Sequence, residues 1–389
     1  MRAEPFVVDI DSQALADLSR RLEQVRWPAD FANEDWRYGT NASYLKDLVD
    51  YWRQHYDWRR HERAMNVYPH FRTVIDGVPI HFIHQRSRAP KAIPLVLTHG
   101  WPWTYWDFNK VIGPLADPEA YGGNAADAFD VIVPSLPGFG FSSPLTTPGI
   151  SFTRTADLWL ALMNEVLGYP RFGAHGSDFG LVVTEQLGHR YAEQMIGVHV
   201  QGASPLDFFS GGAALASDYA PEDAERVARN AHFARSETGY MALQTTKPQT
   251  ISYALHDSPV GLCAWILEKR RAWSDCGGDV EKRFSKDDLL TTVMLYWLTE
   301  TYGTSARFYY ESAHQLWQPS HARTPVIEAP TGVVLFAKDI IGMPRRWAER
   351  YCKLQRWTSV PHGGHFGAME QPEILIHELR EFFRPLRTA

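Results

Sequence analysis

The sequence predicts an α/β fold in which helices cover both faces of a mostly parallel sheet. Short apolar runs such as Ile93–Thr98 and Phe129–Pro134 are each followed by a turn that contains glycine. Helical patterns lie between such runs, as at Thr155–Leu167, which closes on Gly168. Short buried strands that alternate with helices are typical of a parallel sheet. From about residue 205 to 325 this alternation stops and helical patterns dominate, so we expect a helical insert within the core.

The composition is that of a large folded protein with no electrostatic preference for polyanions. The chain has 389 residues, of which 44% are hydrophobic, and its net charge of -6 gives no reason to bind nucleic acid or anionic lipid. No signal peptide and no run long enough to span a bilayer is evident. The three scattered cysteines argue against a disulfide framework or a zinc site and favour a reducing cytoplasm. We therefore expect a cytoplasmic protein that needs no metal or cofactor, whether it is a monomer or a homodimer.

The segment before the predicted core begins with a helix and ends with a hairpin. Residues 11–26 have an amphipathic pattern, with Asp11 or Ser12 available as the N-cap. The polar face mixes both signs of charge, so docking on the protein itself suits this helix better than a membrane surface. Residues 27–70 have only short periodic runs, and we expect a meander wrapped over the rest of the molecule. An Asp-Gly turn then joins two predicted strands, Phe71–Ile75 and Ile80–His84.

The same patterns place the remaining elements and divide the chain. Further strands are expected at Phe172–His175, Ile196–Val200, Gly332–Phe336 and Trp357–Val360. Helices are expected within the insert at Leu262–Lys269 and Leu289–Thr299, and at the end of the chain at Pro372–Phe383. The resulting division is an N-terminal region 1–90, a first core part 91–204, a helical cap 205–325 and a second core part 326–389.

A sharp turn between a predicted strand and a predicted helix carries the candidate nucleophile. Such an elbow needs small residues two positions before and two positions after its central residue, because the helix passes close to the strand. Asp178 has Gly176 and Gly180 at these positions, whereas Ser177 would have bulky residues there. The context is typical of the α/β-hydrolase fold, with Asp178 in place of the usual serine. A carboxylate nucleophile suits attack on a tetrahedral carbon that bears a leaving oxygen or halide, through an ester intermediate.

The acid and the base of a catalytic triad follow in the order that this fold requires. Asp339 lies just past the strand Gly332–Phe336, and His365 lies in a Gly-Gly-His-Phe loop between the last strand and the closing helix. Ligands bind outside the carboxyl ends of parallel strands, so Glu328, which precedes its predicted strand, would lie at the wrong end of the sheet. His362 is the near competitor of His365 as the base.

The segment His99-Gly100-Trp101-Pro102 follows an earlier strand, where this fold supplies a donor to an oxyanion hole. The backbone N–H of Trp101 and that of Phe179, the residue after the nucleophile, are predicted to form this hole.

Motifs that are typical of one known family of enzymes occur in order along nearly the whole chain. In the core they are His99-Gly100-Trp101-Pro102, Gly176-Ser177-Asp178-Phe179-Gly180 and Gly363-Gly364-His365-Phe366. In the N-terminal region they include Arg26-Trp27-Pro28 and Tyr56-Asp57-Trp58-Arg59. In the insert they include Glu237-Thr238-Gly239-Tyr240 and Ser305-Ala306-Arg307-Phe308-Tyr309-Tyr310-Glu311. With these motifs the sequence resembles the microsomal-type epoxide hydrolases.

The resemblance implies an enzyme that converts an epoxide and water to a vicinal diol through an ester on Asp178. It also implies that the insert is a cap over the active site, from which Tyr240 and Tyr309 donate hydrogen bonds to the epoxide oxygen. Residue patterns alone do not select this pair, because the insert contains other tyrosines. A phenol suits the role, since it can stabilise and then protonate an alkoxide while it stays neutral at physiological pH. Bacterial relatives include detoxifying enzymes and enzymes that tailor epoxides in secondary metabolism, such as enediyne antibiotic biosynthesis.

Two positions depart from the pattern of the resembling family. Phe179 stands where tryptophan is usual, and Trp103-Thr104 stands where Gly-Ser is usual. Both Trp103 and Phe179 are expected to reshape the substrate pocket, which we expect to accept an apolar or aromatic epoxide. The N-terminal membrane anchor of some eukaryotic relatives is not expected here.

Two other functions are compatible with the scaffold. A haloalkane dehalogenase also uses an aspartate nucleophile but lacks the paired cap tyrosines. A non-catalytic binding protein would be expected to have lost one of Asp178, Asp339 and His365. Incubation with styrene oxide, a haloalkane and an aryl ester would separate these functions by the product formed: diol, halide or phenol.

Overall fold

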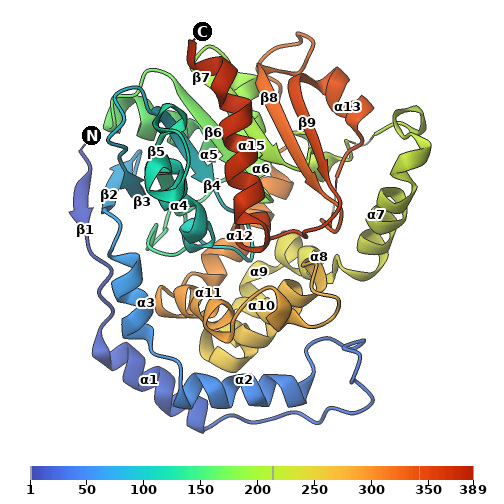
Figure 1. Ribbon diagram of the computed structural model, residues 1–389. Coiled ribbons are helices and arrows are strands. Elements are labelled where there is room, and N and C mark those ends of the chain that lie inside the picture. Colours follow the sequence, from blue (N-terminus) through green and yellow to red (C-terminus); the bar gives the residue numbers. More distant parts are fainter. Residues whose placement is uncertain (1, 213, 341, 389) are drawn as a thin grey trace.

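A nine-stranded sheet forms the centre of the molecule in the computed structural model, which describes residues 2–212, 214–340 and 342–388 (Figure 1). The strands lie in the order β1-β2-β3-β5-β4-β6-β7-β8-β9. Neighbouring strands are parallel from β5 to β9 along this order, and β1, β2 and β3 pair antiparallel with their neighbours. The predicted mostly parallel sheet is therefore confirmed. The strands are β1 (Glu4–Phe6), β2 (His70–Ile75), β3 (Val78–Gln85), β4 (Ile93–Thr98), β5 (Phe129–Pro134), β6 (Phe172–Gly176), β7 (Met195–Gln201), β8 (Ile327–Phe336) and β9 (Cys352–Val360).

Most strand boundaries agree with the sequence patterns. β4 and β5 have the predicted bounds, and β2 and β3 form the predicted hairpin. Asp76 and Gly77 have positive φ values of 49° and 78°, as a tight hairpin turn requires. β8 begins earlier than predicted, so Glu328 lies near the start of that strand and not before it.

Helices cover the sheet on both faces. α4 (Asn109–Ala116) and α15 (Pro372–Phe383) lie on one face, and α5 (Phe152–Ala161) and α6 (Phe179–Arg190) lie on the other (Figure 1). Alternate residues of a strand point to opposite faces, so Gly197 of β7 faces the Phe382 ring while Val198 contacts α6. Two shorter helices, α13 (Arg345–Tyr351) and α14 (Gly367–Glu370), flank β9. The predicted helix Thr155–Leu167 is α5 followed by one π-helical segment, Leu162–Val166.

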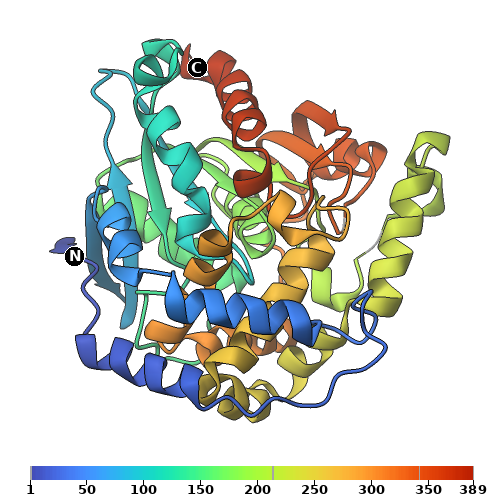
Figure 2. The ribbon, with the colours of Figure 1, turned by 60° about the horizontal axis from the view of Figure 1, so that its bottom comes forward.

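A group of helices lies between β7 and β8 in the sequence and beyond the carboxyl ends of the parallel strands in space (Figures 1 and 2). We call α8 to α12 the insert helices. The predicted helices at Leu262–Lys269 and Leu289–Thr299 correspond to α10 and α11. The bounds in this region are α7 (Ala224–Ser236), α8 (Gly239–Thr246), α9 (Pro248–Asp257), α10 (Pro259–Trp273), α11 (Lys286–Leu298) and α12 (Tyr302–His314).

The N-terminal region wraps around the outer side of the insert helices (Figures 1 and 2). Its helices are α1 (Ser12–Glu23), α2 (Ala42–Gln54) and α3 (Trp58–Met65). Asp11 is the N-cap of α1 and accepts a hydrogen bond from the Gln13 N–H. The expectation of a meander is correct only in part, since α2 and α3 occupy much of residues 27–70. Among the residues described, no helix has the length and apolar character needed to cross a bilayer.

Contacts between the N-terminal region and the insert are polar as well as apolar. The Thr40 hydroxyl donates to the Ala264 carbonyl oxygen at 2.7 Å, and the hydroxyls of Tyr56 and Thr291 lie 3.0 Å apart. Leu48 and Trp52 of α2 are buried, and α2 and α3 both contact α11. The N-terminal region therefore packs against α10 and α11 of the insert, through both hydrogen bonds and apolar side chains.

Candidate active site

The turn between β6 and α6 holds Asp178 in a strained backbone conformation. Asp178 has φ 54° and ψ −121°, outside the regions that residues with a side chain ordinarily adopt. The helix crosses the strand so closely that a Cβ on Gly176 would lie 1.9 Å from the Gly180 carbonyl oxygen, and a Cβ on Gly180 would lie 1.9 Å from that of Thr98. Only glycine fits at both positions. This is the steric requirement that pointed to Asp178 and not Ser177 as the central residue of the turn.

The two oxygens of the Asp178 carboxylate have different partners. Oδ1 accepts a hydrogen bond from the Trp101 N–H at 2.7 Å, because Trp101 follows β4, which pairs directly with β6. Oδ2 lies 3.3 Å from Nε2 of His365, a distance that allows an ion pair. The Phe179 N–H, which begins α6, makes no hydrogen bond to the Asp178 side chain among the described residues. Of the two predicted donors, Trp101 thus holds the carboxylate in this structure.

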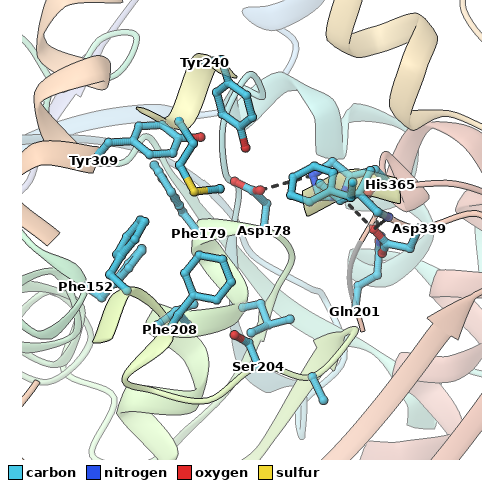
Figure 3. Close-up of a pocket in the computed structure, with 17 residues that line it drawn as sticks. Phe152, Asp178, Phe179, Gln201, Ser204, Phe208, Tyr240, Tyr309, Asp339 and His365 are labelled. Atoms are coloured by element: carbon cyan, nitrogen blue, oxygen red, sulfur yellow. Dashed lines mark hydrogen bonds and ion pairs between the residues drawn. The ribbon is translucent and has the colours of Figure 1, made fainter. Parts of the chain in front are cut away.

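His365 and Asp339 lie at the carboxyl ends of neighbouring strands and meet beside Asp178 (Figure 3). Nδ1 of His365 is 2.8 Å from Oδ1 of Asp339, and both side chains are buried. The structure therefore brings the three predicted triad residues together. His362 is exposed. Glu328, the other acid considered, forms an ion pair with Arg323 near the opposite end of β8.

The charge around His365 favours its protonated form. Burial alone would lower the pKa of His365, but the carboxylates of Asp339 and Asp178 outweigh burial and raise the pKa to about 9. At neutral pH the imidazole is therefore cationic and pairs with both aspartates.

Two tyrosine side chains from the insert helices point toward Asp178 (Figure 3). Tyr240 is on α8 and Tyr309 is on α12, and their rings are perpendicular with centroids 5.8 Å apart. Trp101 stacks on Tyr240 at 5.1 Å, and the Phe179 ring lies 4.5 Å from that of Tyr309. The Tyr309 hydroxyl is buried, and it interacts with the phenol of Tyr240. Burial raises the pKa of both phenols, so both keep their protons.

Other tyrosines of the insert have structural roles. The Tyr296 hydroxyl donates to the Trp103 carbonyl oxygen at 2.8 Å, and the Tyr302 hydroxyl donates to Oε1 of Gln244 at 3.0 Å. Tyr253 is exposed. Tyr240 and Tyr309 are thus the pair that the fold places beside the nucleophile (Figure 3).

Asp178 faces a mostly apolar cavity of about 80 Å³. Phe179, which was expected in the substrate pocket, contributes to the wall. Trp103 does not line this cavity; its ring packs edge-on against that of His365, with centroids 5.6 Å apart. Among the described residues, no group of three or more His, Cys, Asp or Glu side chains is arranged to hold a metal ion. Besides the residues already discussed, the wall includes Phe152, Leu181, Val182, Phe208, Phe209, Phe233, Met241 and Ile340.

Comparison with known proteins gives the family. Residues 3–108 match the family described as "Epoxide hydrolase N terminus", and residues 95–378 match the family described as "Alpha/beta hydrolase family". A protein of Stigmatella aurantiaca that is provisionally named an epoxide hydrolase is 45% identical over 98% of this chain and 85% of its own length. Epoxide hydrolase 1 of Sus scrofa is 35% identical over 97% of this chain and 88% of its own length. The chain belongs to the epoxide hydrolase family.

Solved structures agree with this assignment. The epoxide hydrolase of Aspergillus niger has a TM-score of 0.85 and 27% sequence identity over 99% of this chain and 97% of that chain. The juvenile hormone epoxide hydrolase of Bombyx mori also has a TM-score of 0.85, with 30% identity over 99% of this chain and 95% of that chain. The predicted α/β-hydrolase fold and the predicted epoxide hydrolase function are therefore confirmed.

One side chain of the epoxide hydrolase site was missed by the sequence analysis. Gln201 is the last residue of β7, is almost fully buried and lines the cavity. β7 lies between β6, which leads to Asp178, and β8, which leads to Asp339. The rule that placed Asp339 at the carboxyl end of its strand applies equally to Gln201, so the signal was present in the sequence.

Proposed function

We propose that this epoxide hydrolase opens its substrate through a covalent ester on Asp178. The supporting observation is that the two oxygens of the Asp178 carboxylate have different partners. Oδ1 is held by the Trp101 N–H at 2.7 Å, whereas Oδ2 is on the side of His365. Oδ2 attacks one epoxide carbon while Tyr240 and Tyr309 donate hydrogen bonds to the epoxide oxygen. As the ring C–O bond breaks, one phenol gives its proton to the developing alkoxide.

The second step returns Asp178 to its carboxylate form. His365, oriented by Asp339, takes a proton from water, and the resulting hydroxide attacks the ester carbonyl carbon. Negative charge then develops on Oδ1, which the Trp101 N–H already contacts and which the Phe179 N–H joins in stabilising. When the bond between the carbonyl carbon and the substrate oxygen breaks, that oxygen takes the proton left on the attacking hydroxide, so the diol leaves and Asp178 is a carboxylate again. Before it acts as the base, the cationic His365 of the free enzyme gives up its proton, which restores the tyrosine that ring opening deprotonated, and the proton taken from water then restores the imidazolium.

The cavity supports an apolar substrate. Its aromatic wall contains Phe152, Phe179, Phe208 and Phe233. Binding of an apolar or aromatic group against such a wall is favourable because it removes apolar surface from water. The three cysteines are buried and unpaired, which supports a reducing compartment such as the cytoplasm. A role in detoxification or in secondary-metabolite biosynthesis stays a prediction from the resemblance.

The source of the new diol oxygen tests the covalent mechanism. In a single turnover in oxygen-18 water with enzyme in excess, the diol is expected to be nearly unlabelled, because its new oxygen comes from Oδ2 of Asp178. The label is expected in the peptide that contains Asp178, since solvent oxygen enters that carboxylate. Mass spectrometry of diol and peptide measures both. If Asp178 were instead a general base, the diol would be fully labelled and the peptide would not, which would leave the hydrolase assignment intact and remove the ester.

The rate of ester hydrolysis is expected to rise with pH. His365 is a base only when neutral, and it is protonated below its pKa of about 9 in the free enzyme. Ester formation neutralises Asp178, so the pKa of His365 falls just when a base is needed. Single-turnover hydrolysis rates should follow one ionisation with a midpoint below 9, and Asp339→Asn should lower that midpoint further by removing the other carboxylate. A rate that does not change across this pH range would contradict the role of His365 as base.

A further inference from the structure

One buried amide side chain contacts two members of the triad, Asp339 and His365, and the residue that precedes the third. Gln201 donates a hydrogen bond through Nε2 to Oδ2 of Asp339 at 2.8 Å and another to the His365 carbonyl oxygen at 2.7 Å. Its Oε1 accepts a hydrogen bond from the hydroxyl of Ser177, the residue before the nucleophile, at 3.3 Å. Gln201 stands beside Asp339 and His365 in the wall of the cavity (Figure 3).

The partners of Gln201 fix the orientation of its amide. An amide nitrogen has two N–H donors, and here both meet acceptors: a carboxylate oxygen and a carbonyl oxygen. If the amide were reversed, its oxygen would lie against those two oxygens, and its nitrogen would face the Ser177 hydroxyl. The observed orientation is therefore the one that satisfies every hydrogen bond.

The Asp339 carboxylate is held at both of its oxygens. Oδ1 accepts from Nδ1 of His365 at 2.8 Å and from the Ile340 N–H at 2.7 Å. Among the residues that the structure describes, Gln201 is the hydrogen-bond donor to Oδ2. Without it the carboxylate could rotate about its Cβ–Cγ bond, and the plane in which it meets the imidazole would no longer be fixed. The same amide holds the main chain of His365, so both ends of the acid–base pair depend on one side chain.

We propose that Gln201 is a positioning residue for the second step of the reaction. This inference rests on the proposed ester mechanism. Gln201 keeps Asp339 and His365 aligned for the removal of a proton from water, and it takes no part in the attack of Asp178 on the epoxide. Its loss should slow ester hydrolysis far more than ester formation.

The test measures the two steps separately in Gln201→Leu, with styrene oxide as the probe. Quenched samples analysed by intact-protein mass spectrometry give the rate constant for ester formation, the rate constant for its decay and the fraction of enzyme that reacts. A hydrogen bond to a charged group accounts for about a 10- to 100-fold change in rate when it is lost, so decay should slow by about that factor, while formation stays within about threefold of wild type. Gln201→Met, which removes the same donors, serves if the leucine variant does not fold.

A matched control is available in the same chain. Gln186 on α6 is also buried, and its Oε1 accepts from the indole N–H of Trp317, away from the triad. Gln186→Leu therefore removes an equally buried amide and should leave both rate constants unchanged. A role in folding alone would lower the fraction of Gln201→Leu that reacts and leave the decay constant at its wild-type value, which would overturn the proposal. Equal slowing of both steps would overturn it as well.

Comparison with His365→Gln distinguishes a failure of this inference from a failure of the proposed ester mechanism. If His365→Gln accumulates the ester but Gln201→Leu hydrolyses it at the wild-type rate, only the role of Gln201 is wrong. If neither variant nor the wild type ever carries the ester, the covalent mechanism is wrong, and the role of Gln201 falls with it.

Discussion

His365→Gln is expected to trap the enzyme as an ester with its substrate. Asp178 can still attack the epoxide, because that step needs no base, but water is no longer deprotonated at the ester carbonyl. General base catalysis contributes about 10²- to 10⁴-fold to such a step, so hydrolysis should become slow enough for the adduct to persist. Intact-protein mass spectrometry after addition of epoxide should show an increase equal to one substrate mass.

The control for this variant is His362→Gln. His362 is three residues before His365 in the same loop and is exposed, so its replacement should leave turnover unchanged and give no adduct. If His365→Gln turned over at the wild-type rate without an adduct, His365 would have no part in the mechanism.

The double variant Tyr240→Phe/Tyr309→Phe is expected to lose most of the rate of ester formation. Each hydroxyl interacts most strongly with the alkoxide that develops as the ring opens, so its removal raises the barrier of that step. Loss of one such donor costs on the order of 10²-fold, and loss of both removes the proton donor as well. Stopped-flow or quenched measurement of alkylation under single-turnover conditions gives the rate directly, for the two single variants and the double variant.

Tyr302→Phe is the matched control, since Tyr302 is on the same helix as Tyr309, is equally buried and bonds to Gln244 outside the site. It should alkylate at close to the wild-type rate. If Tyr240→Phe and Tyr309→Phe each kept that rate too, the assignment of the donor pair would be wrong.

The core of the site could be predicted because its requirements are local. The elbow needs small residues at Gly176 and Gly180, where any side chain would collide with backbone, and this identifies Asp178 from five consecutive residues. Asp339 and His365 follow from the ends of strands, and strands such as β4 and β5 are apolar runs bounded by turns.

The other features of the site and of the N-terminal region depend on how distant parts of the chain pack, which residue patterns do not reveal. Tyr240 and Tyr309 were chosen by resemblance, because tyrosines such as Tyr296 and Tyr302 have the same local pattern and differ only in what the fold places beside them. The pocket role expected for Trp103 came from its place where the resembling family usually has Gly-Ser, yet its side chain packs edge-on against the ring of His365. The helix α2 was missed although its buried residues recur with helical spacing, and α3 was missed because it is only 8 residues long.

The packing of the N-terminal region has a consequence for how the two halves of the site are assembled. Asp178, Asp339 and His365 follow strands of the sheet, whereas the two tyrosines come from α8 and α12 of the insert, whose neighbouring helices α10 and α11 contact the N-terminal region. These contacts join distant parts of the chain. The hydroxyls of Tyr56 and Thr291, for example, lie within hydrogen-bond distance although the two residues are 235 positions apart. A contact of such high sequence separation carries a large loop-closure cost. Assembly of the tyrosine half of the site therefore brings together two parts of the chain far apart in sequence, the N-terminal region and the insert.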